Sequence, residues 1–250
     1  MIQGIDKFKE FFQGYEENYI IIGGLATAMV MNDLGFIFRA TKDIDLVVLS
    51  NKNEAFLKRV LHFIEEADYK TKQRTDNPSR HNLFRFCDSD DSSYPEQLEL
   101  FAIHDENSSI ASNRHIIPIK TPEFYSYLSA ILLDKDYYDL LIKHSTNIEG
   151  LHVATAEVLI PLKIHAHLNL INTQHHYDNK HIKDIIRLCT VLDGEEKIQL
   201  RGDPSIDFKN FLPVFNDFEE DRVKNILKSS QISNVTKKDL LELLKQTYQL

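Results

Sequence analysis

The chain has 250 residues, 42% of them hydrophobic and 27% charged, and it carries a net charge of −9. This length suffices for one large domain or two small ones with a sizeable buried core. The negative charge argues against broad nonspecific binding to nucleic acid, because such binding depends on lysine and arginine neutralising phosphates.

The cysteine spacing and the hydropathy exclude several further classes of protein. Cys87 and Cys189 lie far apart with no CxxC or Cys/His spacing, so neither a disulfide framework nor a zinc knuckle is predicted. The first 18 residues lack the pattern of a signal peptide, and we expect a cytoplasmic protein. The longest uncharged apolar window, residues 19–32, is too short to span a membrane, so no membrane partner is predicted.

The first half of the chain alternates helical and strand patterns. We predict an amphipathic helix at 5–17, a buried strand at 19–22, a helix at 25–33, a strand at 44–49 and a helix at 51–66. A weak strand at 69–72 precedes a predicted hairpin with arms at 81–87 and 97–103. A short strand follows at 115–119, and a helix begins at Thr121 with Pro122 in its first turn.

The second half is mostly helical. We predict helices at 137–144, 155–171, 181–192, 217–228 and 237–249, with a short strand at 151–153 and a polar loop around Gly202 and Pro204. The predicted fold is therefore α/β (α+β). It has a core at residues 1–133, with a mixed sheet of about five strands flanked by helices, and a helical C-terminal domain at 134–250.

The most informative motif is Asp43-Ile44-Asp45 at the start of the 44–49 strand. Side chains alternate along a strand, so the two carboxylates lie on one side of it. Like charges this close raise a pKa unless a cation stabilises them, and Mg²⁺ prefers oxygen ligands. Glu99, within the apolar 97–103 arm, is the candidate third acid. The competing interpretations are a solvated strand end for the pair and a solvent-facing position for Glu99.

Gly23 and Gly24 end the first strand and open the next helix. Free backbone N–H groups and the positive end of the helix dipole point outward there, and the missing Cβ atoms admit a phosphate. The alternative is a simple tight turn. The order strand, Gly-Gly, helix and Asp-x-Asp strand resembles the nucleotidyltransferase superfamily of DNA polymerase β-like enzymes. With Arg39-x-Thr41-x-Asp43-Ile44-Asp45, it is most similar to the AbiEii-type toxin nucleotidyltransferases.

This resemblance implies a catalytic set of Asp43, Asp45 and Glu99 that binds two Mg²⁺ ions, and nucleotide contacts from Gly23 and Gly24. Arg39 and Thr41 have two open interpretations. They bind the nucleotide, with Arg39 approaching a phosphate, or they position the acidic strand through hydrogen bonds.

The helical half carries a second similarity to the same family. Residues 154–166 with Lys163, followed by 180–188 with Asp184, are similar to its helix pair of a lysine helix and an Arg/Lys-Asp-x-x-Asp helix. The resemblance implies that Lys163 and Asp184 bind the nucleotide. Arg187 departs from the pattern, which often has an acid there. The alternative is an ordinary charge pair. His165 and His167, two apart on a helix, point to different sides, which argues against a shared transition metal.

The predicted activity is transfer of a nucleoside monophosphate from an NTP to an acceptor hydroxyl. The resemblance implies a tRNA end or a protein as acceptor, or a small molecule as in antibiotic-modifying relatives. An antitoxin protein is a further implied partner. A noncatalytic nucleotide-binding or toxin–antitoxin protein of the same fold is the alternative.

Overall fold

The computed structural model describes residues 3–49, 53–73, 81–103, 116–119, 128–174 and 180–249. The chain divides into two compact units, neither of them continuous in sequence. The core unit comprises residues 1–25, 40–135 and 146–153, and the helical unit comprises residues 26–39, 136–145 and 154–250. The expected domain division between residues 133 and 134 stays a prediction.

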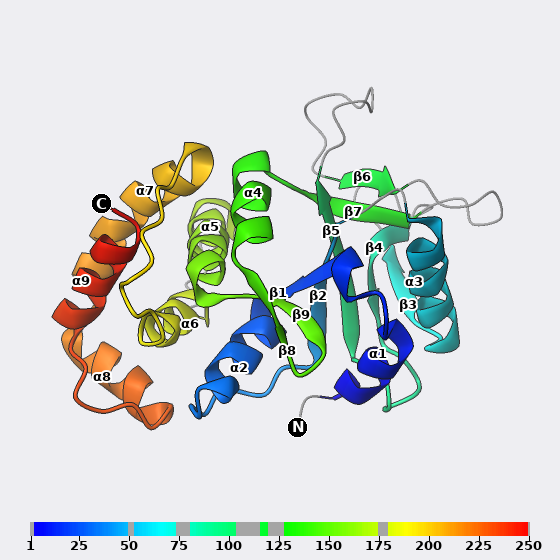
Figure 1. The fold of residues 1–250 in the computed structure, drawn as a ribbon, viewed down its shortest axis with the longest axis horizontal. Coiled ribbons are helices and arrows are strands. Elements are labelled where there is room, and N and C mark those ends of the chain that lie inside the picture. Colours follow the sequence, from blue (N-terminus) through cyan, green and yellow to red (C-terminus); the bar gives the residue numbers. More distant parts are fainter. Residues whose placement is uncertain are drawn as a thin grey trace. The chain divides into compact units, whose positions relative to one another are not determined.

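One mixed sheet organises the core unit (Figure 1). Its strands are β1 (Tyr19–Ile22), β2 (Asp43–Val48), β3 (Lys70–Gln73), β4 (His81–Cys87), β5 (Gln97–Ile103), β6 (Ile116–Ile119), β7 (Leu128–Leu133), β8 (Ser145–Ile148) and β9 (Leu151–Ala154). The main path runs β3-β4-β5-β2-β1-β9-β8, and β7 pairs with both β5 and β6. The sheet is therefore wider than the five strands expected.

Chain direction within this sheet positions the acidic motif. β1 and β2 are antiparallel, whereas β2 and β5 are parallel. β4 and β5 form the antiparallel pair predicted from the sequence. β2 therefore has a neighbour on each side. β5 has β2 on one side, and on the other side it pairs with β4 at its start and with β7 at its end.

Aromatic side chains fix two helices of the core unit to each other and to β1. These are α1 (Ile5–Phe12) and α3 (Glu54–Glu66). Phe8 packs edge-on against Phe63 of α3 and Tyr19 of β1, with ring centroids 5.7 and 5.6 Å apart. Such contacts bury large apolar areas and add a geometric preference of about 1 kcal/mol each. The predicted helix at 5–17 ends early, because Gly14 adopts a φ of +84° and the chain continues as a 3₁₀ turn, Glu16–Asn18.

The helical unit includes α4 (Lys135–Lys143), α5 (Ala156–Gln174), α6 (Lys180–Cys189), α7 (Gly202–Asp217), α8 (Glu220–Ser229) and α9 (Lys237–Thr247). α2 (Gly23–Asp33) begins in the core unit and continues into this one. The helices α4 to α6, α8 and α9 match the predicted ones to within a few residues.

The elements α7, β7 and β8 differ from the sequence-based expectation. Residues 202–217 form α7 rather than a polar loop. Pro204 lies in the first turn, where its missing N–H costs nothing, and Phe208, Phe211 and Phe215 bury one face. β7 and β8 were not predicted, and the start of the helix expected at Thr121 lies outside the described residues.

In the part of the chain that the structure describes, no helix combines the length and apolar character needed to cross a bilayer.

Candidate active site

Asp43 and Asp45 lie on the less buried side of β2. Along the strand they are half-buried, while Ile44 and Leu46 between and beyond them are 1% and 0% exposed. The alternation follows from the two-residue period of a strand. The predicted placement of both carboxylates on one face of β2 is therefore observed.

Gly23 contacts the carboxylate of Asp45. The antiparallel register places Ile22 opposite Asp45, so the chain leaves β1 beside that side chain. A Cβ atom built on Gly23 would lie 1.8 Å from Oδ2 of Asp45, and the φ of Gly23 is +71°. The positive φ strains any other residue at this position, and a side chain there would have to displace the carboxylate of Asp45.

This contact also sets the electrostatics around Asp45. Gly23 is the first residue of α2, and the positive end of the helix dipole favours a carboxylate there. Gly24 is the second residue of the same helix. The predicted phosphate contacts of Gly23 and Gly24 stay predictions, and the structure gives Gly23 a definite role in admitting Asp45.

Glu99 lies directly opposite Asp45 on the neighbouring strand. The parallel register pairs Asp43 with Gln97 and Asp45 with Glu99. Residues opposite each other on adjacent strands present their side chains on the same face. Glu99 is 7% exposed, so its placement departs from the alternative of a solvent-facing hairpin residue.

Arg85, which the sequence interpretation missed, neutralises Glu99. The β4–β5 register sets Arg85 opposite Glu99. Its Nε donates to Oε1 of Glu99 at 3.0 Å, and one terminal guanidinium nitrogen donates to the same oxygen at 2.5 Å. The nine-residue connection 88–96 leaves the hairpin register open in the sequence, so a basic residue in the facing arm was the one available signal.

The three acids Asp43, Asp45 and Glu99 thus lie on one face of the sheet, but their side chains are not arranged as a complete metal-binding site. Among the described residues there is no cluster of three or more His, Cys, Asp or Glu side chains arranged to hold a metal ion. The donor set is all oxygen, as Mg²⁺ requires. Arg85 donates hydrogen bonds to one carboxylate oxygen of Glu99, the acid that would complete this donor set.

Thr41, two residues before β2, is 8% exposed and belongs to the core unit. Its neighbour Lys42 pairs with Glu96 at 2.7 Å, and the backbone N–H of Glu96 donates to the carbonyl of Lys42 at 2.9 Å. These contacts attach the start of β2 to the chain just before β5. The predicted nucleotide contact of Thr41 stays a prediction.

Arg39, Lys163 and Asp184 come together in the helical unit. Oδ2 of Asp184 accepts from Nζ of Lys163 at 2.9 Å and from a guanidinium nitrogen of Arg39 at 3.2 Å. Asp184 is fully buried and Lys163 is 5% exposed. Burial by itself would raise the pKa of Asp184, but Lys163 and Arg39 outweigh it, and the pKa is lowered.

Arg187 joins this cluster from the next turn of α6. One of its guanidinium nitrogens lies 3.7 Å from Oδ1 of Asp184. Others donate to the hydroxyl oxygens of Ser230 at 2.8 Å and Ser229 at 3.0 Å. Three cations therefore surround one buried carboxylate, and the arginine that departs from the family pattern has a structural partner. The predicted nucleotide roles of Arg39, Lys163 and Asp184 stay predictions.

The histidines of α5 do face different environments. His165 Nδ1 lies 2.7 Å from Oδ2 of Asp207 at a half-exposed position. His167 is 3% exposed, and burial lowers its pKa. His181 of α6 is half-buried, and desolvation together with the nearby Lys163 lowers its pKa to about 4. Both His167 and His181 are therefore neutral at pH 7.

Comparison with known proteins yields distant likenesses. No protein-family model matches the chain, and no curated protein matches it either. Each of three similar solved structures is 15% identical to the chain. They are the antibiotic-resistance factor ANT(2'')-Ia, an antigenic nucleotidyltransferase-like protein from Paracoccidioides brasiliensis and JHP933 from Helicobacter pylori.

The matched lengths are long and the structural agreement is loose. The resistance factor covers 84% of this chain and 91% of its own, with a TM-score of 0.42. The match to the Paracoccidioides protein covers 93% of this chain and 96% of that protein, with a TM-score of 0.42. The match to the Helicobacter protein covers 98% of this chain and 88% of that protein, with a TM-score of 0.43. One of the three similar structures is described as nucleotidyltransferase-like, and the closeness to AbiEii-type toxins stays a prediction.

Proposed function

We propose that this protein is a Mg²⁺-dependent nucleotidyltransferase that transfers a nucleoside monophosphate from an NTP to an acceptor hydroxyl and releases pyrophosphate. One observation carries the proposal. Asp45 lies opposite Glu99 on β5, and its carboxylate rests on Gly23 at the first residue of α2. Acids on adjacent strands can hold divalent ions for phosphoryl transfer, and a glycine-opened helix N-terminus can bind a phosphate.

The roles of the chain's own residues follow from their placement. Asp43 and Asp45 would hold the divalent ions, which when bound stabilise charge on the attacking and leaving oxygens. Glu99 would complete the ligand set and accept the proton of the acceptor hydroxyl. Gly24 and the N-terminus of α2 would receive a phosphate.

In this scheme, Glu99 can act only when its ion pair with Arg85 loosens. A carboxylate oxygen that accepts two hydrogen bonds from a guanidinium is a poor metal ligand and a poor proton acceptor until that contact loosens. Glu99 has a second carboxylate oxygen, to which neither of these two Arg85 hydrogen bonds goes. We infer that metal and substrate binding would draw Glu99 toward Asp45 and weaken its bond to Arg85.

The acceptor is the open part of the proposal. The resemblance to AbiEii-type toxins implies a tRNA end or a protein, and an antitoxin as partner. The net charge of −9 makes a protein or small-molecule acceptor more compatible with the electrostatics than a long nucleic acid, since such a molecule would be repelled beyond a local basic region.

A noncatalytic nucleotide-binding or toxin–antitoxin protein of the same fold is the second candidate. The Arg85–Glu99 ion pair favours this second candidate, because it engages the third acid and leaves that acid less able to bind a metal ion. In that case the protein would bind NTP and Mg²⁺ without turnover.

Label transfer from each of the four α-labelled NTPs, with Mg²⁺ and either total RNA or cell lysate, tests the proposal. Asp45→Asn should reduce transfer by about 10²-fold or more, since a metal ligand is lost while the shape is kept. Asp90→Asn is the matched control, because Asp90 is an exposed core-unit acid that pairs with Lys70. NTP binding without transfer to any acceptor would favour the noncatalytic candidate.

A further inference from the structure

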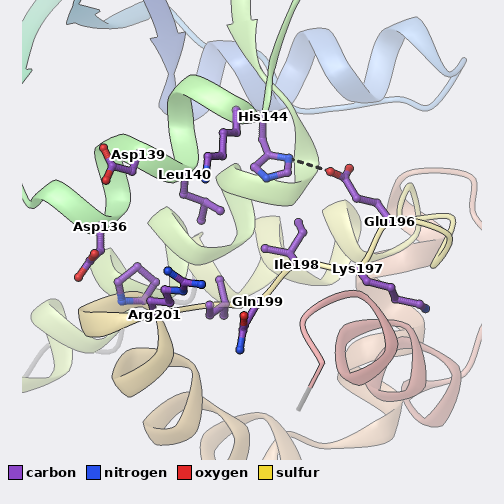
Figure 2. Close-up of a pocket in the computed structure, with 12 residues that line it drawn as sticks. Asp136, Asp139, Leu140, His144, Glu196, Lys197, Ile198, Gln199 and Arg201 are labelled. Carbon is purple, nitrogen blue, oxygen red and sulfur yellow. Dashed lines mark ion pairs between the residues drawn. The ribbon is translucent and has the colours of Figure 1, made fainter.

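A cavity of about 520 Å³ lies within the helical unit (Figure 2), and none of the residues assigned above is among those that line it. α4 supplies one wall, and the extended segment 196–201 that leads into α7 supplies the other. Its volume is in the range of small-molecule sites in proteins, about 300–1,000 Å³. The cavity is therefore large enough for a ligand of metabolite size.

Two acids of the cavity are already engaged by the protein. Glu196 pairs with Nδ1 of His144 at 3.3 Å (Figure 2). The carboxylate of Asp136 lies against Gly202, where an added Cβ would be 1.7 Å from its Oδ2. Gly202 is the first residue of α7, and the helix dipole favours a negative charge at that point. Asp139 also lines the cavity, and it has an interaction of its own.

Two cations of the same cavity have no such engagement. Lys143, at the end of α4, and Arg201, just before α7, line the cavity and are exposed. Within the described part of the chain, neither pairs with an acidic side chain. Lys197 differs, because its Nζ donates to the carbonyl of Gly194 at 2.6 Å. The free positive charge of the cavity therefore belongs to Lys143 and Arg201.

Apolar side chains line the cavity beside these cations. Leu140 comes from α4, and Ile198 and Leu200 come from the extended segment. Ile198 is held in place by its backbone N–H, which donates to the carbonyl of Thr247 at 2.6 Å. A ligand with both an anionic group and an apolar part would match this lining.

We propose that this cavity binds a small phosphomonoester, with Lys143 and Arg201 on the phosphate and with Leu140, Ile198 and Leu200 against the organic part. Two unengaged cations match a group that carries close to two negative charges near pH 7, as a phosphomonoester does. A carboxylate carries one. Arginine also binds phosphate oxygens in a bidentate geometry, and lysine binds them as a point charge.

Calorimetric titration of the full chain with phenyl phosphate tests this assignment. Phenyl phosphate joins a dianion to an apolar ring, inorganic phosphate lacks the ring, and benzoate keeps the ring with a single charge. We expect phenyl phosphate to bind more tightly than either of the other two. Lys143→Gln and Arg201→Gln should each weaken it about tenfold, the usual effect of losing one charge-assisted hydrogen bond.

Lys228→Gln, at an exposed position near the end of α8, serves as the control that removes one positive charge elsewhere in the helical unit. It should leave the affinity unchanged. Both cavity substitutions replace exposed side chains, so unfolding is not a confounding outcome, and circular dichroism verifies this. The assignment is overturned if phenyl phosphate shows no saturable binding up to about 10 mM. It is also overturned if the two cavity variants bind as the control does. Neither outcome bears on nucleotidyl transfer, which the proposed function assigns to other residues.

Discussion

Arg85 and Glu99 face each other across the β4–β5 pair, and the guanidinium donates two hydrogen bonds to one carboxylate oxygen, at 3.0 and 2.5 Å. Glu99 is at the same time opposite Asp45 on β2. A single buried acid is therefore shared between a protein cation and the position proposed for a divalent ion. The proposed Mg²⁺ site therefore predicts that the stability of the core unit depends on Mg²⁺.

Arg85→Gln should lower the free energy of unfolding by about 1–2 kcal/mol in the absence of divalent ions. The value lies below the 3–5 kcal/mol of a fully buried pair, because the Arg85 side chain is 41% exposed. Millimolar Mg²⁺ should restore part of the loss, since it replaces the missing cation. Urea unfolding of the wild-type protein and the variant, with Mg²⁺ and with EDTA, measures both the loss of stability and its partial restoration. An equal loss in the two buffers would contradict the shared role of Glu99.

Gly23→Ala should destabilise the protein more than Gly14→Ala. Both glycines have positive φ, +71° and +84°, but only Gly23 has a neighbour, Oδ2 of Asp45, where the methyl group would go. Gly14→Ala should cost about 1 kcal/mol for backbone strain, and Gly23→Ala about 2–4 kcal/mol for strain and displacement of Asp45 together. Thermal unfolding of the two variants side by side measures the difference. Equal losses would mean that Asp45 moves aside at no cost.

Loss of one partner from the Lys163–Asp184 pair should be costly. Their side chains are 6% and 1% exposed, and removing Lys163 leaves the buried carboxylate of Asp184 with the more distant guanidinium groups of Arg39 and Arg187. Lys163→Met should therefore cost about 3 kcal/mol, and combining it with Asp184→Leu should cost about 1–3 kcal/mol less than the sum of the single losses. Lys238→Met, from an exposed pair with Glu242, is the control and should change stability by less than about 0.5 kcal/mol. Strict additivity of the first two would show that the buried pair is not coupled.

Stability should fall as the pH is lowered from about 6.5 toward 4. Burial and the nearby Lys163 lower the pKa of His181 from 6.5 to about 4. In this range the unfolded chain therefore binds a proton that the folded chain does not, and acid favours unfolding. This difference in the pKa of His181 between the folded and unfolded chain corresponds to about 3 kcal/mol of stability, at about 1.36 kcal/mol per pKa unit. Burial of His167 acts in the same direction, and the lowered pKa of Asp184 extends the loss below pH 3.8.

Urea unfolding at several pH values between 7 and 4 measures this dependence. His181→Gln should flatten it, whereas His62→Gln, at a side chain that is 58% exposed, should not. A variant without His181 that keeps the full slope would assign the acid sensitivity to other groups.

Local patterns predicted much of this fold because the forces that act on them are local. β1 agrees residue for residue with the expected strand at 19–22, and β4 and β5 agree with the expected hairpin arms. α7 was missed because Gly202 and Pro204 indicate a loop, although Phe208, Phe211 and Phe215 recur at helical spacing. Proline in a first helical turn and glycine before it are compatible with a helix start, so the aromatic spacing was the better signal.

The sequence by itself determined that Asp43 and Asp45 share one side of β2, since alternation along a strand is a property of the backbone. It also determined that glycines stand where the first strand meets the next helix. Only the tertiary structure decided that Glu99 lies opposite Asp45, that Arg85 neutralises Glu99, and that the Asp45 carboxylate fills the space beside Gly23. These relationships depend on strand order and register, which are decided by packing between segments distant in the chain, and the nine-residue connection 88–96 does not fix them locally.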